Sequence, residues 1–222
     1  MIKLKKEEYE NMKKLHNKHW YFVGKKNIIN YFIKKYKKNP EILDIGCGDG
    51  YFFDEYKGVG IEPCTLFKKE NIINEPLENI KLDKKFDIIL ALDVIEHLED
   101  DTLIYKFLDK NLKDDGVAII TVPAHKKLFN EHDIAHNHYR RYDKVDLENL
   151  LKNYNNKIYY YNSLLYPIAY VVRKITKGKN NLKLGNKIVN KILTSIFSFE
   201  KYTYKYHLTG MSLLAIVKKS SK

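Results

Sequence analysis

Residues 41–50, Glu41-Ile-Leu-Asp-Ile-Gly-Cys-Gly-Asp-Gly50, decide the fold that we expect for this chain. A short apolar run leads into three glycines within five positions. This pattern predicts a buried strand that enters a tight turn, where the backbone can come close to a ligand. The glycines alternate, so they depart from the G-x-G-x-x-G frame of a pyrophosphate-binding turn. A second apolar run, Val59-Gly-Ile61, ends at Glu62, where a ribose-binding carboxylate is expected.

Apolar, strand-like runs alternate with helix-like segments along the rest of the chain. We expect strands at about 41–46, 58–62, 72–74, 86–92 and 117–122, a sixth near 158–161 and a last one in the closing TGMSLLAIVKK. We expect helices over about 9–23 (one amphipathic helix or two short ones), 28–36, 103–116, after Pro167 and around 188–197. This alternation predicts a mostly parallel sheet with helices on both faces.

Polar residues stand where several of the predicted strands end. Asp44, Glu62, Asp93 and His125 all fall at carboxyl ends of strands. Ligands of open α/β sheets bind outside these ends. We therefore expect the four side chains to converge on one crevice.

Longer motifs suggest a family. LDIGCGDG followed by GIEP resembles the class I S-adenosylmethionine-dependent methyltransferases, and ALDVIEHLED (91–100) resembles the motif of a group that includes ubiquinone-pathway O-methyltransferases and bacterial glycan-cluster enzymes. HWYFVGKK, VPAHKKLFNEHDIAHNHYRRYD and TGMSLLAIVKK are similar to a bacterial and archaeal branch of it, so the resemblance spans roughly 16–150 and the last strand. It implies an α/β, Rossmann-like, seven-stranded and mostly parallel sheet with helices on both faces and a helical insertion before the last strand.

The resemblance also implies a cofactor site. The cofactor would be S-adenosylmethionine and the product S-adenosylhomocysteine. The implied contacts are Asp44, Gly46, Cys47, Gly48, Glu62, Glu75, Leu92 and Asp93. The first four would meet the methionine half, Glu62 the ribose hydroxyls, and the last two the nucleoside. Glu75, in NEPLENI, would take the place of an adenine-binding acidic residue, although this segment departs from the usual Asp-containing pattern.

Histidines gather in the segments that follow the predicted strands. The cofactor carries an activated methyl group, so the protein must align an acceptor and exclude water. A hydroxyl acceptor must also lose its proton, most readily to a histidine. Four histidines are candidates for this base: His97, His125, His132 and His138. The alternative for each is a hydrogen-bonded loop histidine.

The run Asp93-Val-Ile-Glu96-His97 has a second interpretation. It resembles the metal-binding pattern of some ubiquinone-pathway and small-RNA 2′-O-methyltransferases, in which a further histidine, here His138, follows the fifth strand. Such ligands suit Mg²⁺ or Mn²⁺, and Zn²⁺ as well. Many methyltransferases carry a similar motif without a metal, and we favour the metal-free interpretation.

Two further sets of residues are candidates for substrate contact. Arg140 and Arg141 are two of only three arginines in a lysine-rich chain, which favours planar, bidentate contacts to carboxylate or phosphate. An ion pair with Asp143 or Asp146 is the alternative. Trp20 and Tyr21 lie in residues 1–38, which we expect to form a lid of N-terminal helices. Ordinary core packing would explain these aromatics equally well.

Residues 166–207 form the predicted helical insertion within a single domain, 1–222. It is apolar, aromatic and lysine-rich, so it could cap the substrate site, form a dimer surface or lie in a bilayer interface. The two cysteines and the lack of an apolar signal core lead us to expect a cytoplasmic location. If the insertion lies in a bilayer interface, the protein would also be peripheral at the inner membrane face. The net charge of +12 indicates an anionic partner. The alternative is that the abundance of Lys, Asn, Ile and Tyr merely reflects the base composition of the gene.

The sequence thus predicts an S-adenosylmethionine-dependent O-methyltransferase that acts on a small-molecule, glycan or lipid-linked acceptor. The alternative is a metal-assisted RNA 2′-O-methyltransferase, which net charge and the Asp93 motif would support. Neither an RNA-binding module nor a platform of alternating aromatic and basic residues is visible, so we do not expect a nucleic-acid partner. A non-catalytic cofactor-binding protein would lack the ionisable groups found here.

Overall fold

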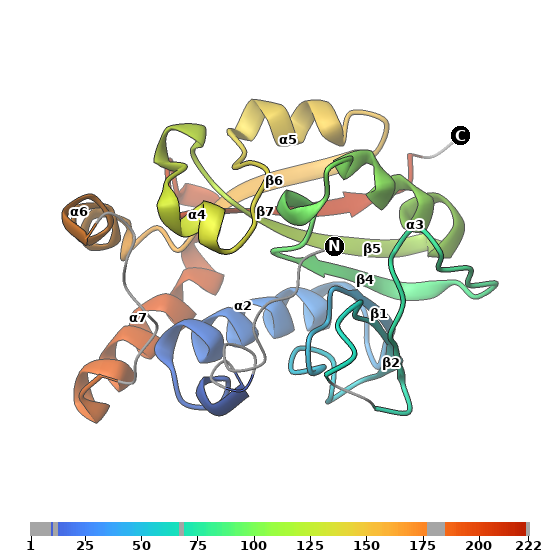
Figure 1. The fold of residues 1–222 in the computed structure, drawn as a ribbon, viewed down its shortest axis with the longest axis horizontal. Coiled ribbons are helices and arrows are strands. Elements are labelled where there is room, and N and C mark those ends of the chain that lie inside the picture. The colour runs from blue at the N-terminus through green and yellow to red at the C-terminus, as the bar shows by residue number, and fades with distance from the viewer. Residues whose placement is uncertain (1–9, 11–12, 67–68, 177–184, 221–222) are drawn as a thin grey trace.

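A seven-stranded sheet forms the centre of the computed structural model, which describes residues 10, 13–66, 69–176 and 185–220 (Figure 1). The strands are β1 (Glu41–Ile45), β2 (Lys57–Ile61), β3 (Ile72–Ile73), β4 (Phe86–Leu92), β5 (Leu112–Pro123), β6 (Asn155–Tyr161) and β7 (Ser212–Lys218). Their order is β3-β2-β1-β4-β5-β7-β6, and β7 runs antiparallel to both of its neighbours. The predicted Rossmann-like, mostly parallel sheet is confirmed.

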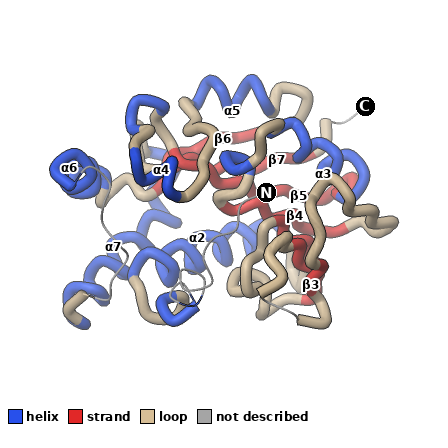
Figure 2. Tube along the Cα trace, in the orientation of Figure 1, coloured by secondary structure: helices blue, strands red, loops and turns tan. Residues whose placement is uncertain are grey.

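Helices connect the strands and cover the sheet (Figure 2). The α-helices are α2 (Trp20–Tyr36), α3 (Ile104–Asn111), α4 (Glu131–Ala135), α5 (Lys144–Leu150), α6 (Tyr166–Thr176) and α7 (Lys187–Thr203). Short 3-10 turns are η1 (Ile95–His97), η2 (Asp101–Leu103), η3 (Lys126–Leu128) and η4 (Tyr204–Tyr206). Helices α6 and α7 lie between β6 and β7, where the insertion was predicted.

The two faces of the sheet bury separate apolar layers because successive strand residues point in opposite directions. On one face, Leu43 and Ile89 pack with Phe107 of α3 and Leu147 of α5. The other face carries a second layer, in which strand residues pack with α2 and α7: Ile42, Ile88, Ile29, Phe32 and Phe197. Helices therefore cover both faces, as the strand–helix alternation predicted.

The first helical region differs from the expected one. The chain turns at residues 16–19, and α2 then runs without a break from Trp20 to Tyr36. His19 caps this helix, because its Nδ1 accepts a hydrogen bond from the Tyr21 backbone N–H at 3.3 Å. The predicted break between residues 23 and 28 was wrong: Val23 and Ile28 lie on the same helix.

The helix after β4 is shorter than predicted. It ends at Asn111, whose side-chain amide donates to the Leu82 and Lys84 carbonyls, and β5 begins at once with the buried Leu112 beside Phe86. The expected end near Gly116 was wrong because these long-range contacts of Asn111 and Leu112 override the local helical pattern.

Helix α7 packs directly along α2. A Cβ added to Gly24 would lie 2.5 Å from the Phe197 ring, and Phe197 itself is fully buried. Among the described helices, none is both long enough and apolar enough to cross a lipid bilayer.

We expect Gly24→Ala to lower the free energy of unfolding by about 1–3 kcal/mol, because the new methyl group collides with Phe197. Helix propensity alone would predict the opposite, a gain of about 1 kcal/mol. Urea-induced unfolding measures the difference. Lys34→Ala, at an exposed position of the same helix, is the control and should change stability by less than about 0.5 kcal/mol. A more stable Gly24→Ala variant would contradict this packing.

Candidate active site

The predicted glycine turn follows β1 and has an open side. Gly46, Gly48 and Gly50 all have positive φ, and the N–H groups of Gly46 and Cys47 donate to the Ile61 carbonyl at 2.7 and 3.1 Å. A Cβ on Gly46 would lie 2.5 Å from Val94, whereas a Cβ on Gly48 would meet no atom within 4 Å. The turn is thus pressed against the segment after β4 while Gly48 presents bare backbone to open space.

Glu62 ties this turn to the loop after β2. Its carboxylate is buried and accepts hydrogen bonds from the backbone N–H of Gly48 at 2.9 Å and of Cys64 at 3.0 Å. Asn74, after β3, donates to the Glu62 and Cys64 carbonyls, both at 3.0 Å. Glu62 therefore stands beside the open glycine at the edge where the strands end.

Asp44 lies at the end of β1 and is almost completely buried. Its Oδ2 has no hydrogen-bond partner among the described residues. Burial raises the pKa of this carboxyl well above its usual value, and the charge of Lys25 opposes that rise. A buried polar atom without a partner calls for an explanation, and a hydrogen-bonding or cationic ligand supplies one. Burial also raises the pKa of the neighbouring Cys47 thiol, so this thiol stays protonated.

Asp93, directly after β4, joins three elements. Its Oδ2 accepts hydrogen bonds from Lys25 Nζ at 2.6 Å and Tyr21 Oη at 3.3 Å, and its Oδ1 accepts one from Thr121 Oγ1 at 2.9 Å. Burial favours the neutral carboxyl, but the Lys25 charge prevails and lowers the pKa of Asp93. Lys25 is only 3% exposed; burial would lower its pKa, but Asp93 raises it. The two groups therefore form an ion pair between a buried lysine and a partly buried carboxylate.

Glu96, His97 and His138 form a compact cluster beside Asp93. One ligand atom from each lies within 4.8 Å of the others. Glu96 is fully buried, and neither of its carboxylate oxygens has a hydrogen-bond partner within the described part of the chain. Burial and the charge of Asp93 raise the pKa of Glu96 well above its usual value. Burial and the neighbouring His138 lower the pKa of His97 to about 4, so this ring is neutral at pH 7.

A buried carboxylate orients His138. The imidazole Nδ1 lies 3.0 Å from Oδ1 of Asp133, which also receives Nε and Nη2 of Arg141 at 2.8 Å each. The other oxygen of Asp133 accepts the Asn130 N–H in the capping box of α4. A carboxylate can only accept, so Nδ1 is the donor of this hydrogen bond, and in the neutral ring Nε2 of His138 is the acceptor.

Sequence reasoning missed Asp133 and Lys25. Asp133 lies in the predicted region, but nothing in the sequence shows that its side chain is buried between His138 and Arg141. Lys25 pairs with a residue 68 positions away, and one lysine among many carries no local signal of burial. The capping-box spacing of Asn130 and Asp133 was the one available clue.

Other predicted site residues lie elsewhere. The prediction that His125 converges with Asp44, Glu62 and Asp93 was wrong: its ring stacks on Tyr160 at 5.7 Å, and its Nε2 lies 3.1 Å from Thr209 Oγ1. Its positive φ of 63° turns the chain at this point. His132 packs against the His136 ring at 4.1 Å.

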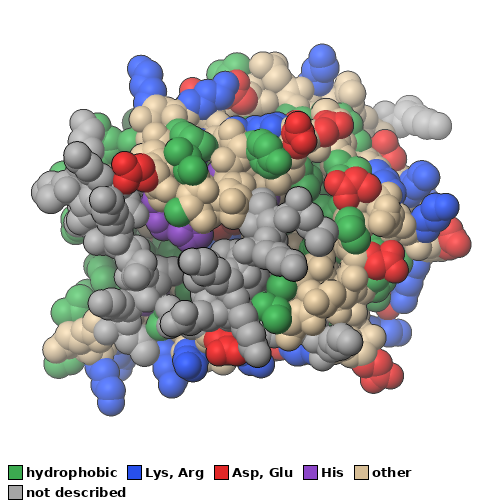
Figure 3. Space-filling view, viewed as in Figure 1, with side chains coloured by type: hydrophobic (Ala, Val, Ile, Leu, Met, Phe, Trp, Pro, Cys, Tyr) green, Lys and Arg blue, Asp and Glu red, His purple; other side chains and the backbone are tan. Residues whose placement is uncertain are grey.

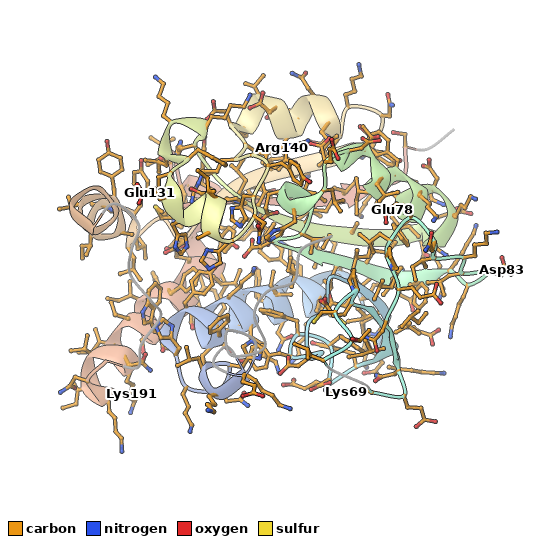
Figure 4. The ribbon with its side chains drawn as sticks, viewed as in Figure 1. Lys69, Glu78, Asp83, Glu131, Arg140 and Lys191 are labelled. Atoms are coloured by element: carbon orange, nitrogen blue, oxygen red, sulfur yellow. The ribbon has the colours of Figure 1, made fainter. Side chains whose placement is uncertain are left out.

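The paired arginines have structural partners. Arg140, labelled in Figure 4, forms an ion pair with Asp101 at 3.0 Å, and Arg141 is buried against Asp133 and the Ala124 carbonyl. Neither pairs with Asp143 or Asp146, the partners considered from sequence. Arg141 therefore acts on His138 through Asp133 and has no exposed group for a substrate.

The two aromatic residues that begin α2 divide their roles. Trp20 packs edge-on against Phe197 at 5.7 Å, while Tyr21 stacks on Phe197 at 5.9 Å and reaches Asp93 with its hydroxyl.

Glu75 is exposed after β3, and its predicted adenine contact stays a prediction. In the space-filling view, histidine side chains gather on one part of the surface beneath α4 (Figure 3).

Comparison with known proteins gives similarities of sequence and fold. A family described as a methyltransferase domain matches residues 18–160. The ubiquinone biosynthesis O-methyltransferase of Rickettsia canadensis (strain McKiel) is 28% identical over 161 residues, which cover 58% of this chain and 68% of that protein.

Solved structures resemble this one in fold. A SAM-dependent methyltransferase from Archaeoglobus fulgidus is 17% identical with a TM-score of 0.53, over 87% of this chain and 92% of that one. The plantazolicin methyltransferase BpumL, in complex with a monoazolic desmethylPZN analog and SAH, is 17% identical with a TM-score of 0.57, over 96% of this chain and 88% of that one.

We expect Glu96→Gln to be more stable than the wild type at neutral pH. Wild-type Glu96 stays protonated when folded but ionises when unfolded, so wild-type stability falls as the pH rises above about 4.5. The amide does not titrate, so its advantage should grow from about pH 5 to 8, by at most about 1.4 kcal/mol per pH unit, and vanish near pH 4. Urea unfolding across this range measures it, and a pH-independent difference would contradict the assigned burial.

Proposed function

This chain belongs to the methyltransferase domain family and is an S-adenosylmethionine-dependent methyltransferase, and we propose that it methylates a hydroxyl oxygen of a small-molecule or lipid-linked acceptor. The observation that carries the proposal is His138, held by the buried Asp133 with its Nε2 left as an acceptor. A hydroxyl must lose its proton as the methyl group arrives, and a neutral histidine is suited to take it. The name of the Rickettsia relative supports oxygen as the methylated atom.

The residues around the glycine turn fit the cofactor. When bound, S-adenosylmethionine supplies an activated methyl group on a cationic sulfonium. The bare backbone of Gly48 permits close approach, and the unpartnered Oδ2 of Asp44 would hydrogen-bond the methionine half. Glu62, which accepts two backbone N–H groups at this edge of the sheet, would also accept the ribose hydroxyls.

The residues in and around the cluster differ in their acid–base properties and would therefore have different roles. His138 would take the acceptor proton at Nε2, and Asp133 would stabilise the resulting imidazolium through Nδ1. His97 stays neutral because of its low pKa, so it would orient the acceptor as a hydrogen-bonding group. Lys25 holds Asp93 in its ionised form, and Tyr21 covers Asp93 from α2.

A divalent cation at Glu96, His97 and His138 is a second candidate for activating the acceptor. One carboxylate and two imidazoles form a donor set that suits Mn²⁺ or Zn²⁺ better than Mg²⁺. The Glu96 oxygens have no hydrogen-bond partner among the described residues, and Asp133 forms a hydrogen bond with the second ring nitrogen of His138. Both features are typical of metal sites. A cation held there would lower the pKa of the acceptor hydroxyl.

If this site binds a cation, addition of MnCl2 to chelator-treated protein should raise the Tm of the wild type but not of Glu96→Gln.

We expect Asp44→Asn to weaken binding of S-adenosylhomocysteine by about tenfold or more. The Oδ2 atom has no partner among the described residues and belongs to a carboxyl that can ionise when a cationic amino group binds beside it, whereas an amide cannot ionise. Isothermal titration calorimetry gives the Kd. The matched control is Asp83→Asn, an exposed carboxyl at the far right of Figure 4, which should bind normally. Unchanged affinity in Asp44→Asn would remove this residue from the cofactor site.

We expect His138→Ala to lower methyl transfer by about 100-fold or more while the Kd for S-adenosylhomocysteine stays unchanged. The assay follows labelled methyl from S-adenosylmethionine into the lipid, glycan, RNA and small-molecule fractions of an extract of the source cells. His136→Ala is the matched control, because the His136 ring contacts a backbone carbonyl of His132 and no acidic side chain. Label that disappears on ribonuclease treatment would support the RNA alternative, and normal turnover in His138→Ala would exclude this base.

A further inference from the structure

Helix α7 has a second apolar face that points away from the protein. Its inner face packs on α2 through Phe197. Its outer face exposes large apolar side chains spaced three, four or seven residues apart: Ile188 (71%), Ile192 (52%), Phe199 (53%) and Tyr202 (62%). With 3.6 residues per turn, these positions form one stripe, which we call the α7 stripe. Large apolar side chains gathered on one side mark an interaction surface.

Lysines border the α7 stripe along one side. Lys187 and Lys191 are exposed on α7 and lie at helical positions next to it, and Lys205 is exposed in η4, just beyond the end of the helix. Figure 4 labels Lys191 at the lower left, where its part of α7 forms the outer edge of the molecule. Figure 3 shows hydrophobic side chains and basic side chains together in that corner.

The surrounding sequence has almost no negative charge. Between Leu164 and Leu208 the chain carries nine lysines and arginines and one acidic residue, so this segment holds eight of the twelve net positive charges. The single acidic residue, Glu200, is fully buried and accepts the N–H groups of Ser163 and Leu164, so it cannot offset the lysines at the surface.

The surface lies on the same helix that supports the active site. Asn190 of α7 accepts the Trp20 N–H at 2.9 Å, and Phe197 stacks on Tyr21, whose hydroxyl reaches Asp93. In Figure 1, α6 and α7 project together from the side of the molecule where α4 and the start of α2 lie. A surface that binds α7 would therefore be close to the site.

We propose that the α7 stripe docks this enzyme on an anionic lipid bilayer, with α7 lying in the plane of the interface. Apolar side chains would enter the headgroup boundary, and the bordering lysines would meet lipid phosphates. The charge argues against a second copy of this chain as the occupant, since two such faces would bring the exposed lysines that border each α7 stripe together. This inference is independent of the methyl acceptor, although it would place the site within reach of a lipid-linked one.

Co-sedimentation with vesicles tests the proposal on the full chain. Vesicles of phosphatidylcholine with about one-third phosphatidylglycerol should bind the protein, vesicles of phosphatidylcholine alone should bind it at least about tenfold less, and added salt should release it. Two variants should each lower the partition coefficient by about tenfold or more: Ile188→Ser/Ile192→Ser/Phe199→Ser removes the apolar contacts, and Lys187→Glu/Lys191→Glu reverses charge.

The matched control is Val145→Ser/Lys152→Glu, which changes an exposed apolar residue and a lysine on or just after α5, away from α7 in Figure 1, and should bind as the wild type does. Affinity for S-adenosylhomocysteine reports folding in every variant, so lost vesicle binding with intact cofactor binding leaves the proposed function untouched. The proposal would be overturned if the wild type did not bind anionic vesicles, or if both α7 variants bound them as strongly as the wild type does. The proposal would also be overturned if the wild type formed a concentration-dependent dimer but bound no vesicles, and if the triple variant abolished that dimer.

Discussion

The ion pair between Lys25 and Asp93 is the interaction on which the site depends. A charge removed from water is tolerated only when it is paired and hydrogen-bonded, and here the partner of a nearly buried lysine is the residue that leaves β4 with a positive φ. The pair fixes α2 against the carboxyl ends of the strands. Through α2 it also fixes Tyr21, Phe197 and the seat of α7. The cofactor edge and the C-terminal insertion are thereby held in one arrangement.

Asp93 and Glu96 show how two residues of one turn acquire opposite acid–base properties. Asp93 is hydrogen-bonded to a cation and two hydroxyl groups, and its pKa falls. The Glu96 oxygens have no hydrogen-bond partner among the described residues, and burial raises the pKa of Glu96 against the opposing charges of Lys25 and Arg141. Groups whose environments push their pKa values apart are typical of sites that handle protons. The cluster therefore holds one fixed negative charge and one carboxyl whose charge depends on what binds beside it.

Much of the fold was predictable because its signals are local. The apolar runs of β1 and β4, the glycine turn and Glu62 depend on a few adjacent residues, and each lies where the sequence placed it. Boundaries set by distant contacts were not predictable: Asn111 ends α3 by bonding carbonyls that precede β4. The rule that side chains meet where parallel strands end located Asp44, Glu62 and Asp93. It failed for His125 because a strand end places the backbone and leaves the side-chain direction open.

The position of β7 between β5 and β6 has a consequence for the order of folding. Strand β6 pairs only with β7, which follows it by about 50 residues in the chain. At ribosomal rates of about 5–20 residues per second, β6 waits several seconds after its synthesis before its hydrogen-bonding partner exists. During that interval β5 has an unpaired edge, and the apolar residues of α6 and α7 emerge before the sheet is closed. A nascent chain of this topology is thus most exposed to aggregation just before its last strand is made.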